Sequence, residues 1–191
     1  MWWFYTVILG MSFGQVLHGL AQGVRSWRIE DDRKIYLPGT LWQIFLLVLI
    51  VQVWLAVTYF RETVTEVSIL GLVAFLCVPA GIFIMTSLLP GQDGDDDDGS
   101  PSYDELFART RPLFFGVLIA MVVINAVHGI VMGELGLDQD LAFQALILAG
   151  AVVGLFLRRP TADAVLAGAM IVMVGTYIAV GYSSVQVMPG G

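Results

Sequence analysis

The only two histidines of this chain lie in matching stretches of sequence. Residues 15–20 read Gln-Val-Leu-His-Gly-Leu, and residues 125–130 read Asn-Ala-Val-His-Gly-Ile. An imidazole can exchange a proton between about pH 5 and 8, line a polar constriction, or bind a transition metal or a haem iron. His18 and His128 are therefore the first candidates for function.

Each histidine belongs to a stripe of amide, imidazole and methionine side chains within an apolar segment. Its members follow one another at steps of four, three and four residues, which places them on one face of a helix. The stripes are Met11, Gln15, His18 and Gln22 in the first segment, and Met121, Asn125, His128 and Met132 in the second. Hydrocarbon cannot satisfy the hydrogen bonds of these groups, so each stripe is expected to face protein or a water-filled cavity.

The composition indicates an integral membrane protein. Of the 191 residues, 58% are hydrophobic and 13% are charged, and the mean hydropathy is +0.83. A soluble domain of this size would carry more charged residues on its surface. The net charge of −7 argues against nucleic acid as a partner, because few basic residues are left to neutralise phosphates.

Six apolar stretches are long enough to cross a bilayer as helices, so we expect an all-α integral membrane protein. They cover about residues 2–23, 41–60, 67–89, 112–133, 141–157 and 162–182. Pro79 lies inside the third stretch and is expected to bend that helix near Phe75, because proline removes one backbone hydrogen bond.

The histidine match extends into a longer internal repeat. Trp42-Gln43 opens the second span much as Phe143-Gln144 opens the fifth. We interpret residues 1–89 and 112–191 as two three-helix repeats, joined by an acidic cytoplasmic linker at residues 90–111. Because each repeat crosses the membrane three times, the second must enter from the opposite side, which gives a 3+3 inverted repeat.

The basic residues predict the orientation of the chain. If both termini are outside, every Lys and Arg except Arg61 lies on the cytoplasmic side, as the positive-inside rule requires. We therefore expect a multi-pass protein of the plasma or inner membrane with both termini outside.

Three functions remain open for such a protein. The favoured one is a channel or facilitator for a small solute or an ion such as the proton, with both stripes lining the path. The first alternative is a b-type haem or copper electron-transfer protein that uses His18 and His128 at a homodimer interface. The second is a structural or accessory subunit in which these groups only form hydrogen bonds between helices. All three fit a homo-oligomer in the lipid bilayer.

The inverted repeat argues against one metal or haem shared by both histidines within a chain. Each histidine would lie about five residues from an opposite membrane face, so the two imidazoles differ in depth by roughly 15 Å at 1.5 Å per residue. Two nitrogens on one metal can be only about 4 Å apart. Any haem or copper site would therefore need a second copy of the chain.

An enzyme is not favoured by the sequence. No serine–histidine or cysteine–histidine arrangement is visible, and no carboxylate is expected deep within a span. Glu66 and Asp163 lie near span ends, where helix capping or contact with the membrane interface explains them.

Overall fold

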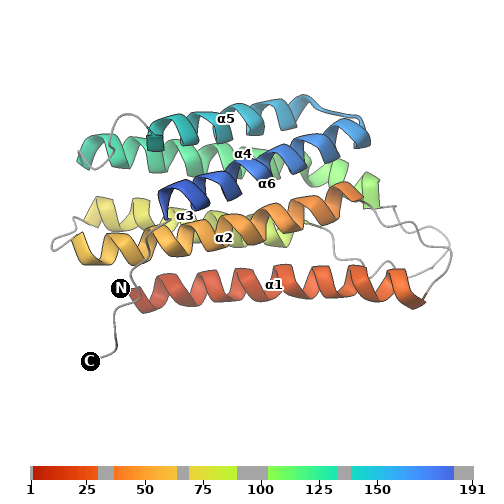
Figure 1. Cartoon of the computed structure of the whole chain (residues 1–191), viewed down its shortest axis with the longest axis horizontal. Helices are drawn as coiled ribbons and strands as arrows, with labels where there is room; N and C mark the ends of the chain where they lie inside the picture. The colour runs from red at the N-terminus through yellow and green to blue at the C-terminus, as the bar shows by residue number, and fades with distance from the viewer. Residues whose placement is uncertain (1, 30–36, 64–68, 90–102, 133–138, 183–191) are drawn as a thin grey trace.

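The computed structural model describes residues 2–29, 37–63, 69–89, 103–132 and 139–182, which form six α-helices. The helices are α1 (Trp2–Ile29), α2 (Leu37–Thr63), α3 (Ile69–Leu88), α4 (Tyr103–Met132), α5 (Gln139–Phe156) and α6 (Pro160–Gly181). Successive helices run in opposite directions along one bundle (Figure 1). We call the end where α1 begins and α6 ends the terminal end, and the end where α3 ends and α4 begins the linker end.

Five of the helices are long and apolar enough to cross a membrane, and α5 is shorter. Large apolar side chains lie on the outside of the bundle, including Trp3, which is 85% exposed, and Phe156, which is 78% exposed. Such a surface is costly in water and suits contact with lipid. The prediction of an all-helical chain is confirmed, and the helices have the length and composition of a multi-pass membrane protein.

Three helices, α1, α2 and α4, extend beyond the predicted spans, and the extensions of α1 and α4 are the longest. α1 continues to Ile29, and α4 begins at Tyr103 and runs through Pro112. A helix satisfies its own backbone hydrogen bonds, so polar side chains at its end need not interrupt it. Residues 103–111, which we assigned to the linker, are therefore the first turns of α4, and residues 90–102 lie outside the described residues.

α3 continues as one helix through Pro79. Proline within a helix removes one backbone hydrogen bond without necessarily ending the helix. The bend expected near Phe75 stays a prediction.

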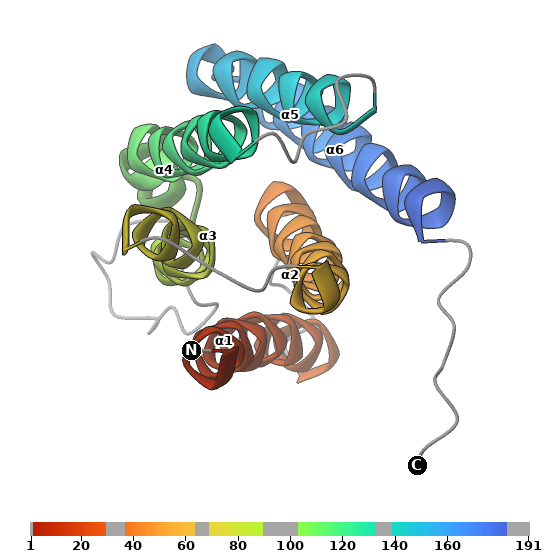
Figure 2. The same ribbon diagram turned by 90° about the vertical axis from the view of Figure 1, so that its left-hand side faces the viewer.

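α1 lies at the edge of the bundle. It packs on α2 and α3, whereas α4 lies between α3 and α5, and α6 packs mainly on α2 (Figure 2). α4 therefore has neighbours on two sides, and α1 has them on one side only. This difference decides the surroundings of the two histidines.

The first two helices pack against one another in the same way in both halves, whereas the third helix of each half packs differently. α1 packs antiparallel to α2, α4 packs antiparallel to α5, and α1 and α4 run in opposite directions. α3 packs mainly on α4, the first helix of the other half, and also on α1 of its own half, whereas α6 packs mainly on α2, the second helix of the other half. The helix pairs agree with an inverted repeat, and the third helices do not, so the full 3+3 repeat stays a prediction.

The most deeply buried part of the core lies toward the linker end. Trp42, Phe45, Phe114 and Phe115 are all 0% exposed. The indole ring of Trp42 meets the other three rings edge to face, with centroids 5.4, 5.6 and 5.1 Å away, a favourable geometry for aromatic pairs. Gly154 lets α5 approach this cluster, because a Cβ there would overlap the ring of Phe115. We call these four aromatic residues the aromatic plug.

Candidate functional site

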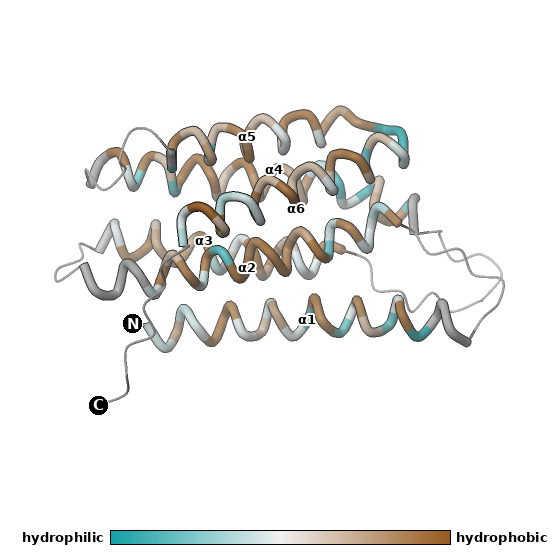
Figure 3. Tube along the Cα trace, in the orientation of Figure 1, coloured by the Kyte–Doolittle hydropathy of each residue, from teal (hydrophilic) through white to brown (hydrophobic). Residues whose placement is uncertain are grey.

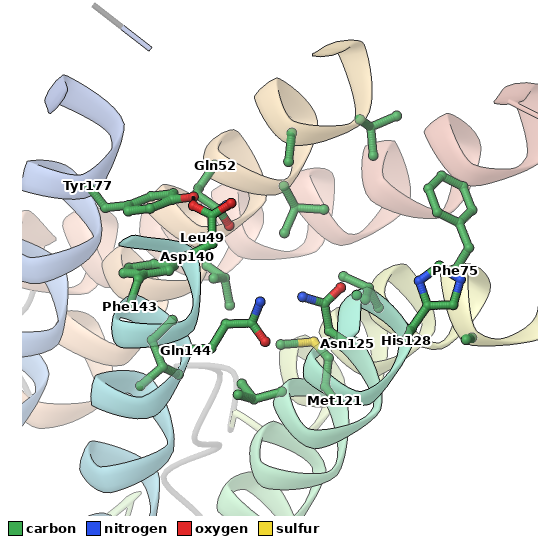
Figure 4. A pocket seen from close by; sticks show the side chains of 18 of the residues that line it. Leu49, Gln52, Phe75, Met121, Asn125, His128, Asp140, Phe143, Gln144 and Tyr177 are labelled. Carbon is green, nitrogen blue, oxygen red and sulfur yellow. Dashed lines mark hydrogen bonds between the residues drawn. The ribbon is translucent and has the colours of Figure 1, made fainter. Parts of the chain in front are cut away.

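A cavity of about 260 Å³ lies toward the terminal end, with α2, α4 and α5 supplying most of its wall (Figure 4). Its polar side chains come from five helices and from the residue after α6: Tyr5 from α1, Gln52 from α2, Asn125 and His128 from α4, Asp140 and Gln144 from α5, Tyr177 from α6, and Tyr182. Apolar and aromatic side chains such as Phe75 complete the lining. A mostly apolar hollow with a few convergent polar groups is typical of a ligand site between helices.

The side-chain amides of Asn125 and Gln144 extend toward one another across the cavity (Figure 4). Oε1 of Gln144 is buried and has no hydrogen-bond partner among the described residues. An unpaired buried acceptor costs about 1–3 kcal/mol. This oxygen is therefore a candidate contact for a bound molecule or for water.

A second polar group lies where α5 begins. The hydroxyl of Tyr177 donates a hydrogen bond of 2.5 Å to Oδ1 of Asp140. The rings of Phe143 and Tyr177 stack with centroids 3.9 Å apart and an angle of 11° between their planes. Asp140 also lies in the first turn of α5, where a negative charge stabilises the start of a helix. These contacts hold α5 against α6 at the cavity wall.

The predicted stripe on α4 lines this cavity. Met121, Asn125 and His128 all contribute to its wall, as does Gly129 beside the histidine. The side chain of Met132 lies outside the part of the chain that the structure describes. Met121 is buried and His128 is half-buried, whereas Asn125 is exposed although it lines the cavity.

The predicted stripe on α1 lies elsewhere. Met11 is 55% exposed, and Gln15 and His18 are also exposed. Gln15 accepts a hydrogen bond of 2.5 Å from Thr86 of α3, and Nε2 of His18 lies 3.0 Å from Nε2 of Gln22. None of these α1 residues is among the described residues that line the cavity. The same motif therefore has different surroundings in the two halves, because α1 lies at the edge of the bundle.

Within the described residues, no group of three or more His, Cys, Asp or Glu side chains converges on one point. His18 has Gln22 beside it, and His128 faces the cavity. The haem or copper alternative therefore has no ligand set of this kind within the described part of one chain, and it depends on a second copy.

Asp163 is a buried partner in an ion pair, so its assignment to a cap or to the interface is wrong. It is 1% exposed and pairs through Oδ1 with the guanidinium of Arg111. The same oxygen accepts a hydrogen bond of 3.3 Å from the indole N–H of Trp42. The N-cap of α6 is Arg159, with no side-chain capping bond. Three helices, α2, α4 and α6, thus meet at this carboxylate.

Arg111 adds α5 to this junction. Its guanidinium donates a hydrogen bond to the backbone carbonyl of Leu157, just past the end of α5, and lies 5.3 Å from the ring centroid of Phe107 and 5.7 Å from that of Phe115. Nε of Arg111 and Oδ2 of Asp163 are buried without hydrogen-bond partners among the described residues. Along α4, the ion pair and the aromatic plug follow one another between the linker end and the cavity.

Four polar lining residues on which the proposals below depend, Gln52, Asp140, Gln144 and Tyr177, were not predicted as site residues from the sequence. Gln52 carried a usable signal, because an amide in the middle of an apolar span is rare and tends to face protein. Asp140 and Tyr177 carried none, since acidic and tyrosine residues are ordinary at span ends.

The comparisons with known proteins add no assignment for these residues. No family model, curated protein or solved structure matches the chain.

Proposed function

We propose that the protein is a small membrane channel or facilitator that carries a small polar solute or an ion through this cavity. The observation that carries the proposal is that Asn125 and His128 of α4 face a cavity together with amides from α2 and α5. Polar groups inside apolar helices are rare, and they usually mark a path for a solute or an ion.

The position of the cavity supports a path that is closed at one end. The cavity lies toward the terminal end, whereas the aromatic plug and the ion pair lie toward the linker end. We infer that the contacts of Asp163 with Trp42 and Arg111 form the closure, because they join three helices through three side chains. Facilitators commonly open by moving one group of helices relative to another around a central site.

The repeat suggests how the closed end opens. Gln43 and Gln144 are equivalent in the repeat, and each has a buried Oε1 without a partner among the described residues. Gln43 packs directly on Gly19, leaving no room for a Cβ there, whereas Gln144 and Gly129 both line the cavity. An inverted repeat predicts that the two halves exchange these arrangements when the path opens to the other side.

We place the linker end in the cytoplasm and the terminal end outside the plasma or inner membrane. Exposed Arg25, Arg109, Arg158 and Arg159 lie at the linker end, where the polar residues around the α5–α6 junction gather (Figure 3). Arg61 lies in the last turns of α2, at the terminal end. The positive-inside rule then makes the terminal end external, and the cavity opens toward the outside.

We also propose a homo-oligomer that covers the exposed face of α1. A Cβ added to Gly10 or Gly14 would meet nothing within 4 Å, and His18, one turn further on, is exposed. Small residues four positions apart allow close contact between helices, and a second α1 would shield the imidazole from lipid. The occupant of this face is therefore a second copy of the chain.

Cross-linking tests the homo-oligomer. In a Cys77→Ala background, Gly14→Cys should give a disulfide-linked dimer in native membranes under mild oxidation. Ala151→Cys is the control, because Ala151 is 0% exposed inside the bundle and should not cross-link. Absence of the dimer for Gly14→Cys, in a sample that elutes as a monomer, would contradict the proposed interface.

The two stripes supply matched variants for the transport proposal. We expect His128→Leu to lower flux about tenfold, because the variant cannot form a hydrogen bond with the solute in the cavity, a loss of about 1.4 kcal/mol. His18→Leu makes the same chemical change on α1 and should leave the flux within about a factor of two, because His18 is not among the residues that line the cavity.

The measurement is flux into proteoliposomes of guanidinium, urea, nitrate and protons, with protein-free vesicles as the baseline. Flux above the baseline for at least one of these, reduced in His128→Leu and kept in His18→Leu, supports the cavity as the path. Baseline flux for all four, or equal loss in both variants, would count against it.

A further inference from the structure

The charge of the cavity wall is negative. Asp140 is the only acidic side chain among the described lining residues, and no lysine or arginine is among them. The described arginines whose side chains are placed, among them Arg109, Arg111 and Arg158, lie at the linker end and do not line the cavity. A cavity of this kind attracts a cation and repels an anion, and its apolar walls strengthen both effects.

The hydrogen-bonding groups of the cavity wall include a buried acceptor without a donor among the described residues. Oε1 of Gln144 is buried without a partner in the described part of the chain. Oδ1 of Asp140 accepts one hydrogen bond, from Tyr177, and an ionised carboxylate can accept several more. A ligand with N–H groups would satisfy both residues.

Aromatic rings supply the rest of the surroundings. Phe143 and Tyr177 stack beside Asp140. Elsewhere in the wall, the ring centroids of Tyr5 and Phe75 lie 4.3 Å apart. The faces of aromatic rings attract cations that lie within about 6 Å. The volume of about 260 Å³ is below the range of about 300–1,000 Å³ found for drug-sized ligands, so the occupant is smaller than a drug-sized molecule.

We propose that this cavity binds a small organic cation that donates N–H hydrogen bonds, with a group of the ammonium or guanidinium type. Asp140 is its charge partner, Gln144 accepts one of its hydrogen bonds through Oε1, and Asn125 faces it from α4. This inference rests on the proposed function, since it names the chemical class of the solute that the path carries.

The test is equilibrium binding of radiolabelled guanidinium, urea and nitrate to the full chain in detergent, at millimolar concentrations. These three planar species are similar in size and differ in charge. Guanidinium should bind at least about tenfold more tightly than urea, a difference of about 1.4 kcal/mol, and nitrate should not bind. Asp140→Asn keeps an acceptor for Tyr177 and should weaken guanidinium binding about tenfold without changing that of urea.

Two further variants make the result specific. Asp140→Glu restores the charge and should recover most of the guanidinium affinity. Glu105→Gln removes an exposed carboxylate at the linker end and should change nothing, which separates the local charge from the net charge of the protein.

The outcomes separate this inference from the proposed function. Equal binding of guanidinium and urea, insensitive to Asp140→Asn but lost in His128→Leu, would overturn the cation assignment and leave the cavity as a solute site. Preferred binding of nitrate would overturn it as well. No binding of any of the three, together with baseline flux, would remove both proposals.

Discussion

Removing either charge of the Arg111–Asp163 pair should destabilise the protein by about 3–5 kcal/mol, because the remaining charge is then buried without a partner. Asp163 is 1% exposed and the side chain of Arg111 is 11% exposed, so water cannot replace the missing group. Arg111→Met and Asp163→Asn are the variants, chosen to keep the side-chain volume nearly constant. The measurement is the free energy of unfolding in mixed micelles, followed by tryptophan fluorescence.

The double variant gives the sharper result. Arg111→Met combined with Asp163→Asn leaves no uncompensated charge, so its loss of stability should be smaller than the sum of the two single losses by about 1–3 kcal/mol. Arg109→Met is the matched control, because Arg109 is exposed on the same helix and should shift stability by less than about 0.5 kcal/mol. Strictly additive losses would show that the two side chains do not depend on one another.

Much of the helical architecture could be predicted from the sequence. All six helices lie where apolar runs were found, since such runs must hydrogen-bond their own backbone in lipid. The ends were less predictable, as α1 and α4 show, because nothing in a polar segment marks where a helix stops outside the membrane. The packing of α6 on α2 was not predictable, since helix periodicity identifies a buried face but not the neighbour that covers it.

The candidate site also has features that could be predicted from the sequence and features that could not. The spacing of Asn125 and His128 predicts a shared helix face, and that face lines the cavity. The same spacing at Gln15 and His18 gives an equally good pattern, yet neither residue lines the cavity, because Gln15 bonds Thr86 of α3 and His18 lies beside Gln22 at the edge of the bundle. Asp163 was misjudged because its partners, Trp42 and Arg111, belong to other helices and come together only through the packing of the bundle.

Blocking the cavity should abolish transport, which is the largest functional effect we expect. Ala56 of α2 lines the cavity and is only partly exposed, so a cysteine there adds little volume. In a Cys77→Ala background, Ala56→Cys should react with a membrane-impermeant thiosulfonate reagent added outside intact cells. The attached group would fill a large part of the cavity of about 260 Å³. Reaction only from the cytoplasmic side would reverse the proposed orientation.

Flux after this modification is the most direct test of the cavity as the transport path. The control is Ala120→Cys, because Ala120 is exposed on the outside of α4 and does not line the cavity; it is modified with a permeant reagent. With the extent of modification measured by mass, we expect fully modified Ala56→Cys to lose at least about nine tenths of its flux, a tenfold effect, while modified Ala120→Cys keeps its flux. Unchanged flux through fully modified Ala56→Cys would contradict the account.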